Sequence, residues 1–360
     1  MEFFLFFLFL LVSISILLYE VIAFNKKGIF SKKEELSGSE PFVSILISAR
    51  NEEENIPHLC HSLTSLSYPK DRFEILIGDD DSDDRSLELL EKHKPSNCTI
   101  HSFKGSAKGK LGVLKNLAKL AKGQFQLFTD ADVVLNPNWI QGMIYRKQKS
   151  SELHVGVTAV MGEHWFYQLQ NADWLFNQSV IAWVTNHIGP VTAWGNNMSI
   201  DRESFEEVDY SNRIEDTVVE DVELMRSIIK DDGKVCIHAS HDTLVRTKPC
   251  LTFFGLVQQR SRWLHALRGM PWFAFLGLLL KLTLLPTVLI LAFYNPVLLI
   301  FWGVKILLGY SIANYTAKRI GRSVSFLSFL YLDIYEFVLY LFTFVHFLFP
   351  FRLDWKGRRY

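Results

Sequence analysis

Short apolar stretches alternate with amphipathic ones in the first half of the chain. Three stretches have the continuous apolar character of buried strands: residues 42–48 (FVSILIS), 73–78 (FEILIG) and 124–129 (QFQLFT). Residues 55–66 repeat apolar side chains at helical spacing, and a leucine stripe within residues 111–120 predicts a second helix. Because strands that alternate with helices are joined by crossover connections, the pattern predicts a parallel, doubly wound α/β sheet.

A long apolar segment also lies at the start of the chain. Residues 3–24 are mostly Phe, Leu, Ile and Val, and they are about long enough to cross a hydrocarbon layer. They lack a preceding basic stretch and a small-residue cleavage site, so we expect a retained anchor in place of a cleaved signal peptide. Lysines follow at residues 26, 27, 32 and 33. By the positive-inside rule they place the next domain in the cytoplasm.

Three further apolar segments follow near the C-terminus. Each is able to cross a membrane or lie along its surface: residues 272–294, 297–313 and 324–351. The tail beyond them is basic. Three crossings would leave it outside, whereas two crossings and one interfacial helix would keep it inside, so both topologies remain open. The predicted organisation is an anchor at 1–25, a linker at 26–40, a cytoplasmic domain at 41–265 and a membrane region with about three apolar helices at 266–360.

The overall charge and the cysteines narrow the class of protein. Lys plus Arg and Asp plus Glu each number 38, so the net charge is zero and nothing electrostatic favours nucleic acid as a partner. The four cysteines share no metal-ligand spacing, and a cytoplasmic domain would keep them reduced. We therefore interpret them as packing residues.

Polar side chains follow three successive strands of the predicted sheet. They occupy residues 48–52 (SARNE), 79–81 (DDD) and 130–132 (DAD). Ligands of such sheets bind beyond the carboxyl ends of the strands, so the three groups predict one site. Asp130 and Asp132 lie two apart, can point the same way, and can hold a Mg²⁺ or Mn²⁺ ion that also binds a diphosphate. The alternative for so short a pattern is a solvated turn.

Other charged or aromatic motifs each have a structural alternative. Five acids within residues 79–84 can cap the next helix, but their mutual repulsion also favours a bound donor or cation. Glu220 and Asp221 lie in a stretch with a helical pattern. They can lie on a solvated helix face, or one of the two carboxylates can serve as a general base. Residues 258–263 (QQRSRW) suit phosphate and sugar contacts or a plain interfacial anchor. The aromatic helix expected at 164–187 suits lipid headgroups or packing.

Seven short motifs occur in a fixed order. They are RNEE from residue 50, DDDSDD from 79, GKLGVLKN from 109, TDAD from 129, WGNN from 194, ED from 220 and QQRSRW from 258. In this order they resemble family 2 glycosyltransferases, which are inverting enzymes with the nucleotide-binding fold called GT-A. The resemblance covers about residues 42–263. It continues into the apolar region of membrane-bound members such as ceramide glucosyltransferases and cellulose, chitin and hyaluronan synthases.

The resemblance implies roles for the matching positions. The implied donor-binding residues are Ser48, Arg50, Glu52, Asp79, Asp80, Lys110 and Asp130. The implied metal ligands are Asp132 and Asp130, and the implied catalytic base is Asp221. The residues implied at the acceptor and the diphosphate are Glu220, Gln259, Arg262 and Trp263. Asp81 departs from the family pattern, which usually has Gly there and uses the position of Asp80 to bind uracil.

The implied function is the inverting transfer of one sugar from a nucleotide-sugar to a membrane lipid at the cytoplasmic face of the inner membrane. The occupied uracil positions favour a UDP-hexose over a GDP-sugar. A processive polysaccharide synthase is the first alternative, but the chain has fewer membrane segments than we expect for a polymer channel. A non-catalytic scaffold that binds nucleotide-sugar is the second, and it would need Asp80 and Asp130 but not Asp221.

Overall fold

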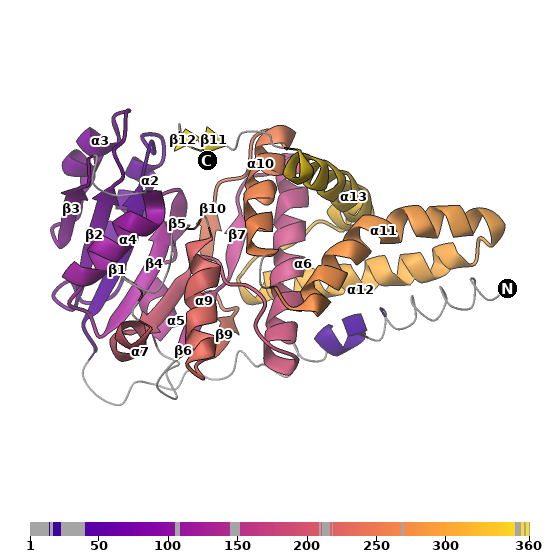
Figure 1. Cartoon of the computed structure of the whole chain (residues 1–360), viewed down its shortest axis with the longest axis horizontal. Coiled ribbons are helices and arrows are strands. Elements are labelled where there is room, and N and C mark those ends of the chain that lie inside the picture. Colours follow the sequence, from indigo (N-terminus) through magenta and orange to yellow (C-terminus); the bar gives the residue numbers. More distant parts are fainter. Residues whose placement is uncertain are drawn as a thin grey trace. The chain divides into compact units, whose positions relative to one another are not determined.

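The computed structural model describes residues 14, 17–22, 40–104, 109–144, 152–208, 210, 217, 219–267, 270–349, 354–355 and 358–359 (Figure 1). By its contacts the chain divides into two compact units. The sheet unit comprises Lys32–Ala159, Thr192–Lys248 and Asp354–Tyr360, and the helical unit comprises Met1–Ser31, Val160–Val191 and Pro249–Leu353. Most of the expected anchor at 1–25 and of the expected linker at 26–40 lies outside the described residues.

The sheet unit is built on a seven-stranded mixed sheet. In spatial order its strands are β3 (Cys98–Ser102), β2 (Phe73–Asp79), β1 (Val43–Ala49), β4 (Phe125–Asp130), β8 (Met198–Asp201), β6 (Glu152–Gly156) and β9 (Lys234–His238). The first four run parallel, and Ser48 of β1 pairs with Gly78 on one side and Asp130 on the other. The three predicted strands and their parallel arrangement are therefore confirmed.

The strand pattern did not predict that β8 runs antiparallel to both of its neighbours, β4 and β6. The loop that precedes β8 gives the reason. The hydroxyl of Thr129, near the carboxyl end of β4, donates to the backbone oxygen of Asn196 at 2.9 Å. Because the chain enters the sheet at this edge, β8 has to run opposite to β4. β6 and β9 then pair in parallel.

Helices pack on both faces of the parallel strands. The core around β1 includes three residues of α2 (Ile56–Thr64), which are Ile56, Leu59 and Leu63. On the opposite face, α4 (Gly109–Leu120) approaches β2 so closely that a Cβ on Gly78 would lie 2.2 Å from Val113. The other helices that the structure describes in this unit are α3 (Ser86–His93), α5 (Trp139–Ile144), α7 (Arg202–Glu207) and α9 (Glu220–Lys230). The remaining strands are β5 (Val133–Leu135), β7 (Thr158–Val160) and β10 (Val245–Thr247) in a second sheet, and β11 (Asp354–Trp355) with β12 (Arg358–Arg359).

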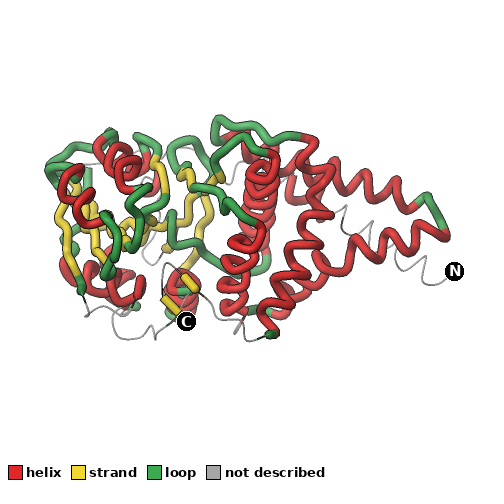
Figure 2. The backbone as a smooth tube through the Cα atoms, turned by 90° about the horizontal axis from the view of Figure 1, so that it is seen from above, coloured by secondary structure: helices red, strands yellow, loops and turns green. Residues whose placement is uncertain are grey.

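The helical unit contains five long helices among its described residues (Figure 2). They are α6 (Trp165–His187), α10 (Phe253–Trp263), α11 (Trp272–Tyr294), α12 (Leu298–Arg319) and α13 (Phe326–Leu348), with a 3-10 turn at Leu264–Leu267. α6 packs against α12 and α13, and α10 and α11 also pack against α13. Near the start of the chain, Leu18 and Val21 pack beside Ile312 of α12.

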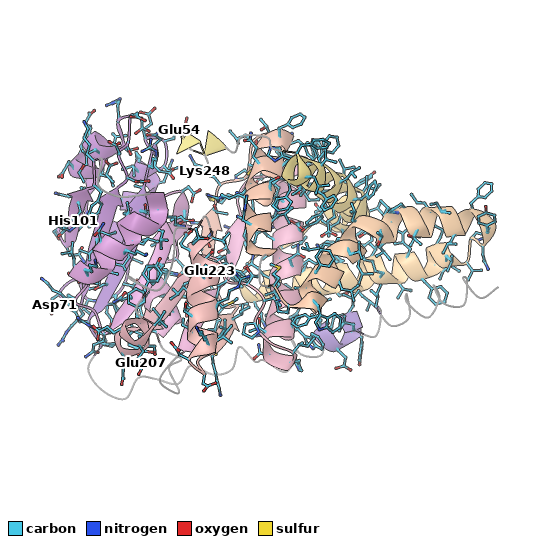
Figure 3. All side chains as sticks on the ribbon, in the orientation of Figure 1. Glu54, Asp71, His101, Glu207, Glu223 and Lys248 are labelled. Carbon is cyan, nitrogen blue, oxygen red and sulfur yellow. The ribbon has the colours of Figure 1, made fainter. Side chains whose placement is uncertain are left out.

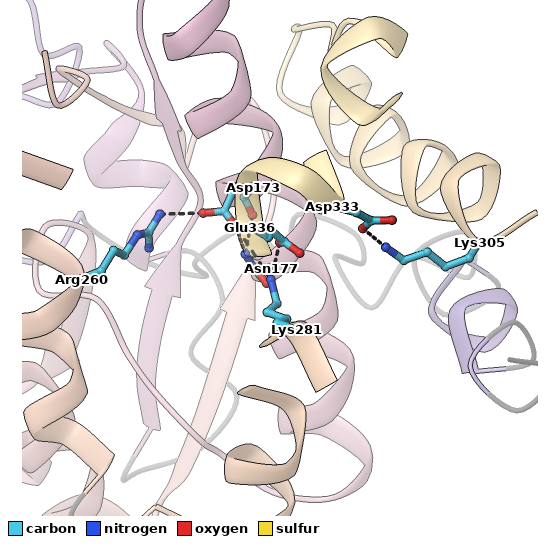
Figure 4. Close-up of polar contacts among 7 residues, drawn as sticks. All are labelled: Asp173, Asn177, Arg260, Lys281, Lys305, Asp333 and Glu336. Carbon is cyan, nitrogen blue, oxygen red and sulfur yellow. Dashed lines mark hydrogen bonds and ion pairs between the residues drawn. The ribbon is translucent and has the colours of Figure 1, made fainter. Parts of the chain in front are cut away.

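Three helices of this unit, α11, α12 and α13, are long and apolar enough to cross a membrane. They expose large apolar side chains, of which Phe293 is 87% exposed. Four of their charged groups form ion pairs inside the unit: Lys281 with Glu336, and Lys305 with Asp333 (Figure 4). From the sequence alone, Asp333 and Glu336 could line a polar path or face other helices or the lipid headgroups. In the structure both face other helices.

Candidate active site

The loops that follow β1 and β2 are bonded to each other at the carboxyl edge of the sheet. Arg50 donates from Nη1 to the backbone oxygens of Asp80 and Asp81, at 2.5 Å each. In return, the backbone N–H of Asn51 donates to Oγ of Ser82 at 3.1 Å. Two of the three polar clusters predicted to converge are thus joined into one rim, and the guanidinium charge of Arg50 offsets part of the repulsion between the acids.

Asp81 has a backbone conformation that explains its departure from the family pattern. Its φ angle is +60°, in the left-handed region that glycine adopts without steric cost. Among other residues Asp and Asn enter this region most readily, and Asn51 across the rim does so as well, with a φ of +50°. Asp81 therefore keeps the turn that the family usually builds with glycine.

The carboxylates of this rim have different surroundings. Asp79 is 3% exposed, and its Oδ1 has no hydrogen-bond donor among the described residues, so it is available to a ligand. Asp84, just before the N-cap residue Arg85, accepts from the backbone N–H of Ser86, the first residue of α3, at 2.9 Å. Glu52 is buried, and its carboxylate accepts from Nδ2 of Asn55 at 2.5 Å at the start of α2.

Lys110 is the centre of a second group of charges. Its Nζ lies 2.7 Å from Oδ1 of Asp130 at the end of β4 and 2.8 Å from Oε1 of Glu220 at the start of α9. Burial alone would lower the pKa of Lys110, but the carboxylates of Asp130, Glu220 and Asp221 outweigh it and raise the pKa well above its ordinary value. Three segments that are distant in sequence thus meet around one permanent positive charge.

Asp221 is held beside this group by a backbone contact. The N–H of Gly195 donates to Oδ2 of Asp221 at 2.8 Å, and a Cβ on Gly195 would lie 3.4 Å from the Cβ of Asp221. Burial and the neighbouring charge of Glu220 raise the pKa of Asp221 to about 6, although Lys110 and two backbone N–H groups lower it. A carboxylate in this state binds and releases a proton near neutral pH, as a general base requires.

The Q-x-x-R-W motif lies on α10 in the helical unit. Gln259, Arg262 and Trp263 are each half-buried, whereas Arg260 between them is 8% exposed. The ring of Trp263 packs edge-on against that of Trp174 on α6, with their centroids 5.3 Å apart. The motif residues therefore lie on a helix whose buried face is fixed inside its own unit.

Two family models match the chain. The model described as glycosyl transferase family 2 matches residues 44–209, and the model described as glycosyl transferase family group 2 matches residues 127–353. The chain belongs to the family 2 glycosyltransferases.

Curated relatives and a solved structure agree with this family. The beta-monoglucosyldiacylglycerol synthase of Trichormus variabilis is 27% identical over 241 residues, which cover 64% of this chain and 50% of that protein. The synthase of the same name from Synechocystis sp. is 28% identical over 234 residues, which cover 62% and 47%. The chain spans about half the length of these relatives.

The solved structure is a mannosyltransferase from Pyrobaculum calidifontis in complex with GDP-Man and Mn²⁺. It is 14% identical to this glycosyltransferase, with a TM-score of 0.53, and the match covers 94% of this chain and 99% of that chain. The likeness confirms the GT-A fold that the motifs implied.

In this glycosyltransferase two carboxylates at the end of β4 and just beyond it fit a hard divalent cation. Asp130 and Asp132 are both half-buried and offer carboxylate oxygens, which are the ligands that Mg²⁺ and Mn²⁺ prefer. Within the described part of the chain, no group of three His, Cys, Asp or Glu side chains is close enough to enclose a metal ion.

Sequence reasoning named the WGNN motif but missed what its residues do. Gly195 positions Asp221, as described above. Asn197 is fully buried, accepts from Nε1 of Trp139 at 2.9 Å, and donates to the backbone oxygens of Val157 at 3.0 Å and Thr243 at 2.9 Å. The motif could have identified these residues, because a glycine and polar side chains directly before a strand indicate a loop with a defined conformation.

Proposed function

We propose that this glycosyltransferase moves one sugar, with inversion, from a nucleotide-sugar to a membrane lipid. The observation that carries the proposal is the state of Asp221. Its carboxylate has a raised pKa, is held by the N–H of Gly195, and lies in the group of charges around Lys110. A carboxylate that is ionised near neutral pH but retains appreciable basicity suits the removal of a proton from a sugar acceptor.

In this mechanism Asp221 accepts the proton of the acceptor hydroxyl as the oxygen attacks the anomeric carbon. The bond between the sugar and the diphosphate breaks on the opposite face of the ring, which inverts the configuration, and the nucleoside diphosphate leaves with the bonding electrons. The cationic side chains of Lys110 and Arg262 would stabilise the negative charge that grows on the leaving group. The bond from Gly195 keeps the Asp221 carboxylate oriented during the transfer.

The donor-binding roles follow the family pattern and the rim geometry. Asp79 and Asp80 would bind the uracil of a UDP-hexose, and the buried acceptor atom of Asp79 supports this. Asp130 and Asp132 would hold Mg²⁺ or Mn²⁺, which when bound would neutralise charge on the diphosphate. The remaining residues of the proposed donor pocket are Ser48, Arg50, Glu52 and Lys110.

Three observations support a lipid as the acceptor of a single sugar. The matched curated relatives carry the name beta-monoglucosyldiacylglycerol synthase. Among the described residues, three helices are able to cross a membrane. The charged groups of Asp333 and Glu336 are paired with lysines, which favours a packed bundle over a polymer channel. Glu220, Gln259, Arg262 and Trp263 would act at the acceptor and the diphosphate.

The charge pattern of the chain also supports a location for the enzyme and for its catalytic domain. We place the enzyme in the cytoplasmic membrane with a catalytic domain at residues 41–265 facing the cytoplasm, where nucleotide-sugars are made. The lysines that follow the apolar N-terminal segment support this orientation. The net charge of zero gives no electrostatic reason to expect nucleic acid as a partner.

The test is a transfer assay on the full chain in lipid nanodiscs, with labelled UDP- and GDP-sugars, Mn²⁺ or Mg²⁺, and membrane lipids as acceptors. The expected product partitions into organic solvent and carries one sugar per lipid, and a chelator removes the activity. A growing polymer would indicate a processive synthase. Absence of turnover with every donor would favour a nucleotide-sugar-binding scaffold.

The catalytic base is tested by Asp221→Asn. We expect turnover to fall by about 10²–10⁴-fold, the usual contribution of a general base, with donor affinity nearly unchanged. Glu223→Gln is the matched control, because Glu223 lies on the same helix (Figure 3). Its carboxylate pairs with Arg226 at 2.5 Å. Near-normal turnover in Asp221→Asn would mean that another group takes the proton.

A further inference from the structure

A fully buried carboxylate on α6 joins three helices of the helical unit (Figure 4). Oδ2 of Asp173 accepts a hydrogen bond from Nη2 of Arg260 on α10 at 2.6 Å. Its Oδ1 accepts from Nδ2 of Asn177 at 2.5 Å and lies 3.8 Å from Nζ of Lys281 on α11. Because a buried charge is costly unless it is paired and hydrogen-bonded, these partners fix the carboxylate in one orientation.

Arg260 connects this carboxylate to the tryptophan of the Q-x-x-R-W motif. The guanidinium carbon of Arg260 lies 4.3 Å from the ring centroid of Trp263 and 5.5 Å from that of Trp174. A guanidinium is planar, so it can stack on an aromatic face while its N–H groups bond to a carboxylate. The position of Arg260, and with it that of the Trp263 indole, therefore depends on Asp173.

We propose that Asp173 is a positioning residue for sugar transfer: it holds Arg260, and Arg260 holds the indole of Trp263 in a single orientation. This inference rests on the proposed function, in which Trp263 acts at the donor diphosphate and the acceptor. Trp174, next to Asp173 in sequence, packs edge-on against the same indole and completes the cluster. Asp173 itself lies in none of the seven sequence motifs.

The helical unit contains a matched control in Asp333 of α13. Asp333 is 7% exposed, pairs with Lys305 of α12, and accepts from Nε1 of Trp302 at 2.6 Å. It is therefore a second buried carboxylate that pairs with a cation and orders an indole, but the indole is not the one in the motif. Replacing either aspartate by asparagine removes one buried negative charge from the same unit.

The experiment records ¹⁹F NMR spectra of the full chain labelled with 5-fluorotryptophan in nanodiscs, with resonances assigned from single Trp→Phe variants. We expect Asp173→Asn to shift the resonances of Trp263 and Trp174 and to leave Trp302 unchanged. Asp333→Asn should shift Trp302 alone. In transfer assays Asp173→Asn should lower kcat about tenfold with the acceptor KM within threefold, because geometry is lost while binding remains. Asp333→Asn should stay within twofold of the wild type.

Arg260→Lys keeps the proposal testable if Asp173→Asn fails to fold. Lysine retains the positive charge beside Asp173 but lacks the planar face, so we expect the same shift at Trp263 and the same loss of kcat. A Trp263 resonance that stays in place in these variants would overturn the proposal, as would an equal loss of transfer in Asp333→Asn. If the wild-type chain transfers no sugar but Asp173→Asn still shifts the ¹⁹F resonance of Trp263, the proposed function is contradicted. The coupling of Asp173 to Trp263 through Arg260 is then still supported.

Discussion

The protonation of Asp221 depends on the charges that surround it. Burial and the carboxylate of Glu220 raise its pKa to about 6, against the lowering effect of Lys110 and the backbone N–H groups. A protonated carboxyl cannot accept the proton of the acceptor hydroxyl. We therefore expect turnover of the wild-type enzyme to fall as the pH falls through about 6, well above the pH at which an ordinary aspartate is protonated.

Glu220→Gln should shift this loss of turnover at acid pH, the acid limb of the pH profile, to lower pH. The substitution removes a neighbouring negative charge, so the pKa of Asp221 falls toward its ordinary value and the base stays ionised in more acid solution. The measurement is the pH profile of kcat for transfer. Glu223→Gln, which breaks the partly buried pair with Arg226, should keep the wild-type pH profile. If Glu220→Gln keeps it too, a group other than Asp221 controls the acid limb.

The left-handed turn at Asp81 gives a stability prediction. Valine is strongly disfavoured at a φ of +60°, so Asp81→Val should lower the free energy of unfolding by about 1–3 kcal/mol, whereas Asp81→Gly should be tolerated. The melting temperature in detergent measures both. Asp83→Val is the control, because Asp83 lies in the same loop without a positive φ. Equal melting temperatures for Asp81→Val and Asp83→Val would mean that the turn relaxes.

At the scale of residues, the sequence predicted which carboxylates gather but not how they are held. The ends of adjacent parallel strands meet at one edge, so the grouping of the polar clusters after β1, β2 and β4 follows from strand order. Arg50 was expected in the nucleotide pocket, and its contacts with the backbone oxygens of Asp80 and Asp81 depend on a loop conformation that residue spacing does not encode. The contact of Gly195 with Asp221 joins distant segments and is equally invisible to spacing.

Among the elements, the loop before β8 is held by the side chain of Asn197. Asn197 bonds to Trp139 of α5 and to backbone oxygens at Val157, before β7, and Thr243, before β10. Asn197→Leu would leave these three buried groups unpaired, at about 1–3 kcal/mol each, so we expect a large loss of stability. Thermal unfolding in detergent measures it. Asn138→Leu, at an exposed position, is the control, and comparable melting temperatures would show that water satisfies the three groups.

Element prediction succeeded where a pattern is long or uniformly apolar. The helix of residues 272–294 has the expected bounds, and β1, β2 and β4 lie within a residue of theirs. β8 and β6 were not predicted, because they are short and carry polar residues, and their extended form comes from pairing with each other. α12 runs past its predicted end at residue 313 to Arg319, where Thr316 bonds to Ser179 of α6 at 2.7 Å.

At the scale of the whole molecule, contacts group segments that the sequence separates. Val160–Val191 and Pro249–Trp263 lie within the stretch expected to form the catalytic domain, yet they belong to the helical unit with α11, α12 and α13. The reason is local packing: α6 contacts α12 and α13, and α10 contacts α13. Hydrophobic periodicity identifies a helix but does not name its partner, so this grouping could not be predicted from the sequence.

The number of membrane crossings can be argued from the charge of the tail. The residues beyond α13 are basic, so by the positive-inside rule we expect the tail on the cytoplasmic side, from which α11 departs. That requires an even number of crossings, and α11 and α12 are the natural pair because Val288 and Leu298 pack together close to the short connection between these helices. We therefore expect α13 to lie along the membrane surface, which is the second of the two topologies that the charge pattern left open.

Cysteine labelling in sealed vesicles tests this topology. We place single cysteines by Glu54→Cys in the loop after β1, Tyr294→Cys at the end of α11, and Arg358→Cys in β12, and treat each with a membrane-impermeant maleimide. Glu54 and Tyr294 are both exposed, so access depends on the side of the membrane. Positions 54 and 358 should label from one side and position 294 from the other. If position 358 labels together with 294, the chain crosses three times and the tail contradicts the positive-inside rule.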